Sequence, residues 1–354
     1  MQFGLQMAFQ SWGYPDGTLD SQVFAEEIHL AEVAAEVGFD ALWPVEHHFE
    51  DYALCPDNTM LLAHFAARIP KIKLGTGAVI VPWHEPLRIA ERIAMLDHLS
   101  GGRLLFGMGR GLSRREYEGF GISMDESRDR FDEGARMVID ALETGFIEGN
   151  GPYYPQKRTE IRPRPERSFT DRTYAVGMSP ESVDAAADIG ARLVIFSQRP
   201  AGDQAADYER YCDRFRAAHD REPGPMVTCD FIYCDKDRKK AEDIAHEHLA
   251  GYLHSVMDHY ELMGDHFKTA KGYETYGSTV DLMKAVGLDV IAEHYVDAQA
   301  WGTPDDVIQK LQARRELLGG DYDLNCCFRY AGLPIDLAEQ SLRTFAESVL
   351  PAMR

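Results

Sequence analysis

Short apolar runs alternate with segments of helical periodicity along nearly the whole chain. Residues 74–81 form a run without a charged side chain, which is typical of a strand covered on both faces. Ile89, Ile93 and Leu96 then recur at helical spacing, and residues 103–108 form the next apolar run. A strand, a helix and a second strand within this length predict a right-handed crossover unit that joins parallel strands.

The same alternation continues on both sides of this unit. We predict strands at 3–9, 39–45, 74–81, 103–108, 173–177, 193–196, 226–233 and 324–328. We predict helices at 20–37, 58–69, 86–100, 126–142, 179–190, 203–219, 237–257, 303–318 and 335–350. Strands and helices that alternate in this way predict the α/β class and a (β/α)8 TIM barrel, built as a single domain over residues 1–354.

Two segments interrupt the alternation. Residues 149–171 are too rich in proline for a helix, and we predict an ordered excursion. Residues 258–300 are rich in His, Tyr, Gly and Met and show no clear period. A connection of that length usually covers a site or is disordered. We therefore expect insertions after strands four and seven, the second being either a lid or a loop without a gating role.

Composition excludes several classes of partner. The chain has 58 acidic and 37 basic residues and a net charge of -21, which argues against nucleic acid and anionic membranes. No window approaches the roughly 20 apolar residues of a membrane span, and the start lacks signal-peptide features. The six cysteines show no metal-ligand spacing, and the adjacent Cys326 and Cys327 suit a buried strand. We expect reduced thiols, no metal site and a cytoplasmic location.

Two candidate groups for chemistry follow predicted strands at the end where barrel enzymes place their working residues. His47 and His48 follow the second strand, and an imidazole can exchange a proton near pH 7. Adjacent side chains of an extended segment point to opposite faces, so only one of the two can face inward. A surface or supporting role is an equally open interpretation. Residues 115–117, further along, are expected to form a solvated turn.

The second group is cationic. Arg110 lies among glycines within residues 107–111, after the fourth strand, where a guanidinium could bind phosphate in a fork. Ser179 and Ser182 begin the helix after the fifth strand, where hydroxyls and free backbone N–H groups suit an anion. The alternatives are a surface arginine and ordinary capping by Ser179. Residues 107–111 lack the full dinucleotide fingerprint, so an internal NAD(P)H site is not expected.

Together these motifs resemble the bacterial luciferase family of flavin-dependent monooxygenases, and the likeness covers nearly the whole chain. The resemblance implies that His47 is catalytic with His48 beside it. It also implies that Arg110, Ser179 and Ser182 hold the phosphate of FMN.

Residues 74–78 resemble the family strand beneath the isoalloxazine ring. The resemblance places Thr76, Gly77 and Ala78 beside the cofactor and implies a cis peptide bond between the last two. Gly109, also beside the flavin, replaces a reactive cysteine of luciferase, and Met178 replaces a glutamate. Because of these departures, we do not expect light emission.

The family resemblance implies a two-component enzyme. Reduced FMN would come from a separate flavin reductase, and O₂ would oxygenate an aldehyde, ketone, terpene or alkane. The apolar walls are expected from the lid and from Phe9, Trp83, Leu112 and Phe196. A homodimer through the second and third helices is expected. The alternatives are a deazaflavin-dependent hydride-transfer oxidoreductase and a non-catalytic flavin-binding protein, although the retained Glu46-His47-His48 argues against the latter.

Overall fold

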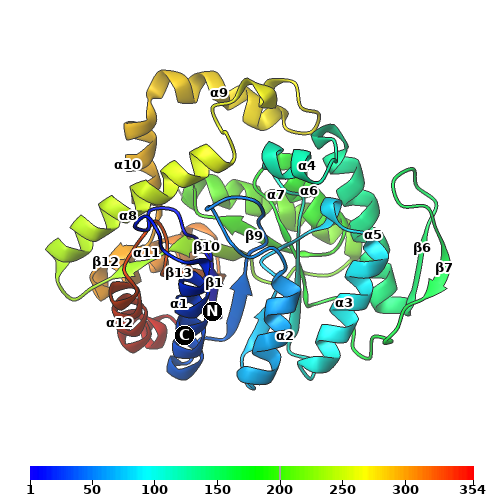
Figure 1. Cartoon of the computed structure of the whole chain (residues 1–354), viewed down its shortest axis with the longest axis horizontal. Helices are drawn as coiled ribbons and strands as arrows, with labels where there is room; N and C mark the ends of the chain where they lie inside the picture. The colour runs from blue at the N-terminus through cyan, green and yellow to red at the C-terminus, as the bar shows by residue number, and fades with distance from the viewer. Residues whose placement is uncertain (199–200) are drawn as a thin grey trace.

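A closed barrel of eight parallel strands forms the centre of the molecule in the computed structural model, which describes residues 1–198 and 201–354 (Figure 1). Each barrel strand pairs with the next one along the chain, and the barrel closes where the last strand pairs with the first. The barrel strands are β1 (Phe3–Met7), β2 (Ala41–Pro44), β3 (Lys73–Gly75), β5 (Leu104–Gly109), β8 (Thr173–Val176), β9 (Arg192–Phe196), β10 (Val227–Phe231) and β13 (Asp323–Cys327). The predicted (β/α)8 fold is confirmed.

Helices surround the barrel and pack their apolar faces against it (Figure 1). α6 and α11 each begin with a reciprocal cap, made by Ser179 with Ser182 and by Thr303 with Asp306. A proline occupies the first turn of both helices, where its missing N–H costs nothing. The outer helices are α1 (Asp20–Val37), α2 (Asn58–Arg68), α3 (Pro86–Leu99), α5 (Ser127–Thr144), α6 (Pro180–Asp188), α7 (Ala201–His219), α11 (Pro304–Leu317) and α12 (Ile335–Met353).

The third predicted strand is broken in the structure. It divides into β3 and β4 (Val79–Ile80), and a short 3₁₀ turn follows at Val81–Trp83. The peptide bond between Gly77 and Ala78 is cis, as the family resemblance implied. β5 passes so close to this segment that a Cβ on Gly107 would lie 2.1 Å from the Thr76 carbonyl oxygen. Glycine is therefore required there.

The first insertion is an ordered excursion, as predicted. β7 (Gln156–Glu160) pairs antiparallel with β6 (Phe146–Gly149), and the hairpin projects beside α5 (Figure 1).

The second insertion differs from the expectation of a segment without clear periodicity. α8 (Arg238–His259) enters it, and η3 (Asp265–Lys268), α9 (Glu274–Val286) and α10 (Leu288–Ala298) follow (Figure 1). Phe267, Tyr273 and Val280 form a small buried cluster of their own within it. These helices pack on one another as much as on the barrel, so no single apolar stripe marks them in the sequence.

Three short elements complete the fold. α4 (Arg114–Gly119) lies between β5 and α5, with a 3₁₀ turn at Met124–Glu126 after it. β11 (Tyr233–Cys234) pairs with β12 (Trp301–Gly302), which ties the end of the second insertion back to the barrel. In the described ranges, no helix has the length and apolarity that a membrane crossing requires.

Candidate functional site

A cavity opens at the carboxyl ends of the barrel strands and is bounded by α8 and the second insertion. Strand ends and the loops after them supply one side, and aromatic residues of α8 and of the insertion supply the other. The lining includes Gln6, Ala8, Glu46, His47, Tyr52, Gly77, Ala78, Ile80, Trp83, Gly109, Arg110, Leu112, Val176, Met178, Ser182, Phe196, Gln198, Phe231, Tyr252, Val256, Tyr260, Leu262 and Tyr276.

Three of the predicted cofactor residues form one backbone surface of this cavity. Gly77, Ala78 and Gly109 all line it, and a Cβ on Gly109 would lie 2.8 Å from Ile80 Cδ1. Thr76, in contrast, is fully buried and does not line it. Its hydroxyl donates to the Gly107 carbonyl at 2.7 Å and accepts from the Gly107 N–H at 2.8 Å. The Thr76 hydroxyl therefore holds two strands together.

Arg110 lines the cavity and also contacts the second insertion. Its Nη1 donates to the Gly272 carbonyl oxygen at 2.6 Å, and its Cζ lies 3.9 Å from the centre of the Tyr273 ring. The Tyr273 hydroxyl in turn donates to the Gly111 carbonyl oxygen at 2.9 Å. The insertion therefore rests directly on the arginine that the sequence singled out.

A second guanidinium, which sequence reasoning missed, lies beside Arg110. Arg128 is in the first turn of α5, and its Nε and Nη2 atoms are buried without a hydrogen-bond partner. Its nearest ion-pair partner is Asp132, at 3.7 Å. Burial, and next the charge of Arg110, lower the pKa of Arg128 below its ordinary value. Unused N–H groups on Arg128, close to the charge of Arg110, are what a bound dianion requires.

The two predicted serines lie at the start of α6. Ser182 lines the cavity, and its Oγ accepts from the N–H groups of Met178 at 2.9 Å and Ser179 at 2.8 Å. Ser179 is buried and caps the helix by accepting from the Ser182 N–H. Ordinary capping therefore accounts for Ser179, whereas Ser182 combines capping with a position at the cavity wall.

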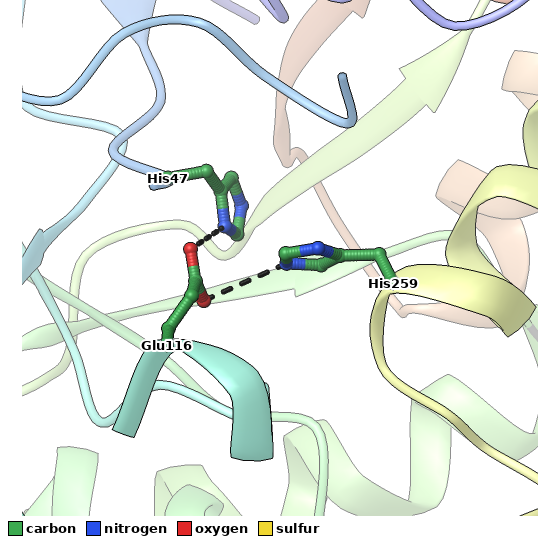
Figure 2. Close-up of side chains that lie close together, drawn as sticks. All are labelled: His47, Glu116 and His259. Carbon is green, nitrogen blue, oxygen red and sulfur yellow. Dashed lines mark hydrogen bonds and ion pairs between the residues drawn. The ribbon is translucent and has the colours of Figure 1, made fainter. Parts of the chain in front are cut away.

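His47 is the histidine that reaches the cavity. Its Nδ1 lies 3.1 Å from Glu116 Oε1 (Figure 2). Its Nε2 lies 3.4 Å from the Tyr260 hydroxyl. Since a carboxylate oxygen only accepts, Nδ1 carries a hydrogen that it donates to Glu116. Nε2 is then the atom that can exchange a proton with a molecule in the cavity.

Glu116 overturns the expectation of a solvated turn at residues 115–117. It is fully buried, and Figure 2 shows its side chain reaching from α4 toward both His47 and His259. Its Oε1 also accepts from the His48 N–H at 2.8 Å. Burial by itself would raise the pKa of Glu116, but charge attraction to His47, and next the contacts with His259 and His47, lower it to about 2. Glu116 is therefore a carboxylate that orients the His47 ring.

His259, in the last turn of α8, is the third member of this cluster and was also missed. Its Nε2 lies 3.5 Å from Glu116 Oε2, and its Nδ1 lies 2.6 Å from Glu50 Oε2. The donor atoms of His47, Glu116 and His259 all lie within 4.8 Å of one another. That spacing suits either a shared proton network or a bound cation. The sequence predicts no metal here, and metal analysis of the purified protein separates the two.

His48 points away from the cavity, so one histidine of the pair faces inward, as strand geometry predicted. Its Nε2 lies 3.5 Å from Glu46 Oε1, and its ring packs against Trp83 and Phe120. Glu46 also binds His84 Nε2 at 2.7 Å. His48 therefore contacts the wall behind the cavity and no cavity space.

Most of the expected apolar lining is present. Trp83, Leu112 and Phe196 line the cavity. Phe9 does not, which corrects the expectation for that residue. β1 ends at Met7, and Phe9 adopts a left-handed backbone with φ of 50°. Its ring consequently packs on Phe24 of α1, with ring centres 5.0 Å apart.

These residues fit a flavin mononucleotide. The unpartnered N–H groups of Arg128 beside Arg110 suit a phosphate dianion. The backbone at Gly77, Ala78 and Gly109 has no side chain long enough to fill the adjoining space, which suits a flat ring. The site therefore combines an anion cradle, a ring surface and an oriented imidazole.

A barrel with this combination defines a flavin-dependent oxidoreductase. A family model described as luciferase-like monooxygenase matches residues 1–321. The chain therefore belongs to the luciferase-like monooxygenase family, and the resemblance noted from its motifs is confirmed.

Known proteins resemble the chain over nearly its whole length. The alpha chain of alkanal monooxygenase from Photorhabdus luminescens is 24% identical over 331 residues, which cover 92% of this chain and 91% of that one. Among solved structures, the monooxygenase RslO1 from Streptomyces bottropensis has a TM-score of 0.83 at 27% identity, with 99% of each chain covered.

Two further structures share the fold at 19% identity, which is evidence for the fold alone. The oxygenating constituent of 3,6-diketocamphane monooxygenase from Pseudomonas putida, in complex with FMN, has a TM-score of 0.78 and covers 100% of this chain and 99% of that one. The coenzyme F420-dependent tetrahydromethanopterin reductase from Methanopyrus kandleri has a TM-score of 0.67, with 100% and 99% covered.

Proposed function

We propose that this chain is the oxygenating component of a two-component monooxygenase. It would take reduced FMN from a separate flavin reductase and use O₂ to oxygenate a small apolar organic substrate. The observation that carries the proposal is one cavity that reaches both Arg110 and His47, with two unpartnered N–H-bearing atoms of the Arg128 guanidinium, Nε and Nη2, near the charge of Arg110. We also propose that residues 1–354 act as one barrel domain.

In this proposal, each part of the cavity has a separate task. Arg110, Arg128 and the turn at Ser182 hold the phosphate, and the ring lies along Gly77 and Ala78. Bound reduced FMN supplies the electron pair that activates O₂. Apolar walls and the helices of the second insertion keep water away from the reacting atoms.

His47 handles the proton in this scheme. Glu116 accepts from Nδ1 and so fixes the ring orientation and the tautomer. Nε2, beside the Tyr260 hydroxyl, is left to give a proton to or take one from an oxygen atom of the substrate. We propose His48 only as a supporting residue, because its ring lies behind the cavity wall.

The cavity walls favour a carbonyl compound among the expected substrate classes. Trp83, Phe196 and Phe231 supply apolar surface, and Tyr252 and Tyr260 add phenol groups to the same cavity. A phenol O–H can donate to a carbonyl oxygen, which an alkane or a terpene hydrocarbon lacks. We therefore rank aldehydes and ketones above alkanes and terpene hydrocarbons.

Several features support the proposed partners. The chain lacks a full dinucleotide fingerprint, so NAD(P)H would be oxidised by a separate reductase. α2 and α3 pack together and expose Met60 (72%), Met95 (49%) and Leu99 (57%), which supports a homodimer through these helices. The acidic composition and the unpaired buried cysteines agree with a cytoplasmic location.

A deazaflavin-dependent hydride-transfer enzyme is the second candidate, because F420-dependent structures share this fold. The test offers the protein FMN and coenzyme F420 in separate binding titrations, and then reduced FMN from a flavin reductase with ¹⁸O₂ and a panel of aldehydes and ketones. Incorporation of ¹⁸O into product supports the proposal. Binding of F420 alone, with substrate reduction and no oxygen incorporation, would favour the second candidate.

A matched variant pair shows whether the cavity is responsible. His47→Ala is expected to abolish ¹⁸O incorporation, whereas His254→Ala, an exposed position on α8, should not. Unchanged oxygenation by His47→Ala would refute the role given to this residue. FMN binding without any turnover in the wild type would instead point to a non-catalytic flavin-binding protein.

A further inference from the structure

His259 lies between two carboxylates. Its Nδ1 is 2.6 Å from Glu50 Oε2, and its Nε2 is 3.5 Å from Glu116 Oε2. The side chain is only 1% exposed, and its ring stacks on Tyr52 with centres 4.3 Å apart and planes within 7°. Neither His259 Nε2 nor Glu116 Oε2 makes a hydrogen bond in the described part of the chain, so the contact between them is one of charge alone.

Two carboxylates favour a positive charge on this ring. A carboxylate oxygen only accepts, so Nδ1 of His259 carries the hydrogen of the bond to Glu50. Glu116 Oε2, at ion-pair distance from Nε2, adds a second negative charge beside the ring. The position of His259 in the last turn of the 22-residue helix α8 also favours a positive charge, because the helix dipole places negative charge at that end.

His259 and His47 each lie next to a different oxygen of the same carboxylate (Figure 2). Oε1 of Glu116 faces His47 Nδ1 at 3.1 Å, while Oε2 faces His259. The two rings meet edge to face with centres 5.2 Å apart. Glu116 holds one negative charge, so the more of it His259 neutralises, the less remains to stabilise a proton on His47 Nε2.

The groups around both rings are few. His47 is faced by four of them: Glu116 from α4, His259 from α8, Tyr260 after α8, and Tyr52 from the loop before α2. Glu50, Glu116, Tyr52 and Tyr260 face His259. Arg115 Nη1 donates to the other carboxylate oxygen of Glu50, Oε1, at 2.7 Å. Asp258 lies 3.5 Å from the same Arg115 nitrogen.

We propose that His259 is a positioning residue, a buried, positively charged ring that shares Glu116 with His47 and thereby disfavours a proton on the cavity-facing Nε2 of His47. The inference deepens the proposed function, on which the catalytic meaning of His47 rests. The charge sharing itself is a property of the protein without cofactor. Because His259 lies at the end of α8, where the second insertion begins, the charge sharing also links the position of that helix end to the protonation of His47.

The test follows the His47 ring by NMR in the protein without flavin, using histidine labelled at the ring carbon. His259→Gln and His259→Phe both remove the positive charge, and the phenyl ring preserves stacking on Tyr52. A unit charge 5.2 Å away should move the titration midpoint of His47 upward by about one pH unit or more at an effective dielectric constant near 20. His254→Gln, on the exposed side of α8, is the control and should leave it unchanged.

Two results would overturn the inference. One is a His47 midpoint that stays fixed or falls in both folded His259 variants. The other is a stoichiometric divalent metal in purified wild-type protein that His259→Gln loses, because the cluster would then serve a cation. In the loaded enzyme, the acidic limb of the kcat profile should shift upward by the same amount as the NMR midpoint. An NMR shift without oxygenation would refute the proposed function and leave the charge sharing intact.

Discussion

Arg128 offers the sharpest test of the anion cradle, because its ion pair with Asp132 is long and leaves two of its three guanidinium nitrogens without a partner. Its Nε and Nη2 are buried without partners, and Asp132 is 3.7 Å from its Nη1. In the protein without cofactor, burial and the charge of Arg110 both disfavour the positive charge of Arg128 and lower its pKa. Arg128→Leu should therefore change the free energy of unfolding of the free protein by less than about 1 kcal/mol.

The effect on FMN should be much larger. A forked, charge-assisted contact to phosphate contributes roughly 2 to 4 kcal/mol, which is a factor of about 30 to 1000 in Kd. Riboflavin has the same ring but no phosphate, so its affinity should be nearly unchanged. Arg128→Lys keeps the charge but loses the fork, and its FMN affinity should lie between the wild type and Arg128→Leu.

Fluorescence quenching titrations with FMN and riboflavin measure this selectivity directly. Arg136→Leu, an exposed arginine on the same helix, is the matched control and should bind both flavins as the wild type does. An unchanged ratio of the FMN and riboflavin dissociation constants in Arg128→Leu would refute the cradle. A large loss of stability in the free variant would show that the guanidinium has a structural role.

Three further predictions concern other parts of the molecule. Glu116→Gln should leave the FMN Kd unchanged but lower kcat by about 100-fold or more, since His47 loses its orienting charge; equal kcat in both proteins would contradict this. Trypsin should cut after Lys268 or Lys271 more slowly when FMN is bound than when riboflavin is, because this segment rests on Arg110; equal cutting would count against cofactor-linked closure. Burial raises the pKa of Glu27 to about 7, although the charge of Arg329 opposes the shift. Protonated Glu27 therefore stabilises the folded protein below pH ~4.5, and this contribution is lost as the pH rises toward 7. Glu27→Gln should therefore gain roughly 1 to 3 kcal/mol over the wild type in urea unfolding at pH 8 but not at pH 4.5, and the same difference at both pH values would disprove the assignment.

Periodicity alone was enough for the barrel, because each strand is an apolar run and each outer helix carries a single apolar face. The break between β3 and β4 was not visible in the same pattern, since residues 74–81 carry no charged side chain. The helices of the second insertion were missed for a related reason. α9 and α10 expose Leu282, Val286 and Val290, so their apolar positions do not mark one buried stripe.

The site likewise contains residues that the sequence could identify and residues that it could not. His47 and Arg110 follow strands and stand in recognisable local surroundings, so the sequence could identify them. Glu116 lies in a six-residue helix between charged neighbours, and nothing local shows that its side chain turns inward. Arg128 is one of several arginines around α5, and His259 comes 212 positions after His47. Their roles depend on contacts that only the closed barrel creates.

A crystal structure of the protein with bound FMN would locate the phosphate and the ring. We expect the phosphate to contact both Arg110 and Arg128, the ring to lie along Gly77 and Ala78, and His47 Nε2 to face the space beside the ring. A phosphate bound elsewhere, with the Arg128 guanidinium still unpartnered, would contradict this arrangement.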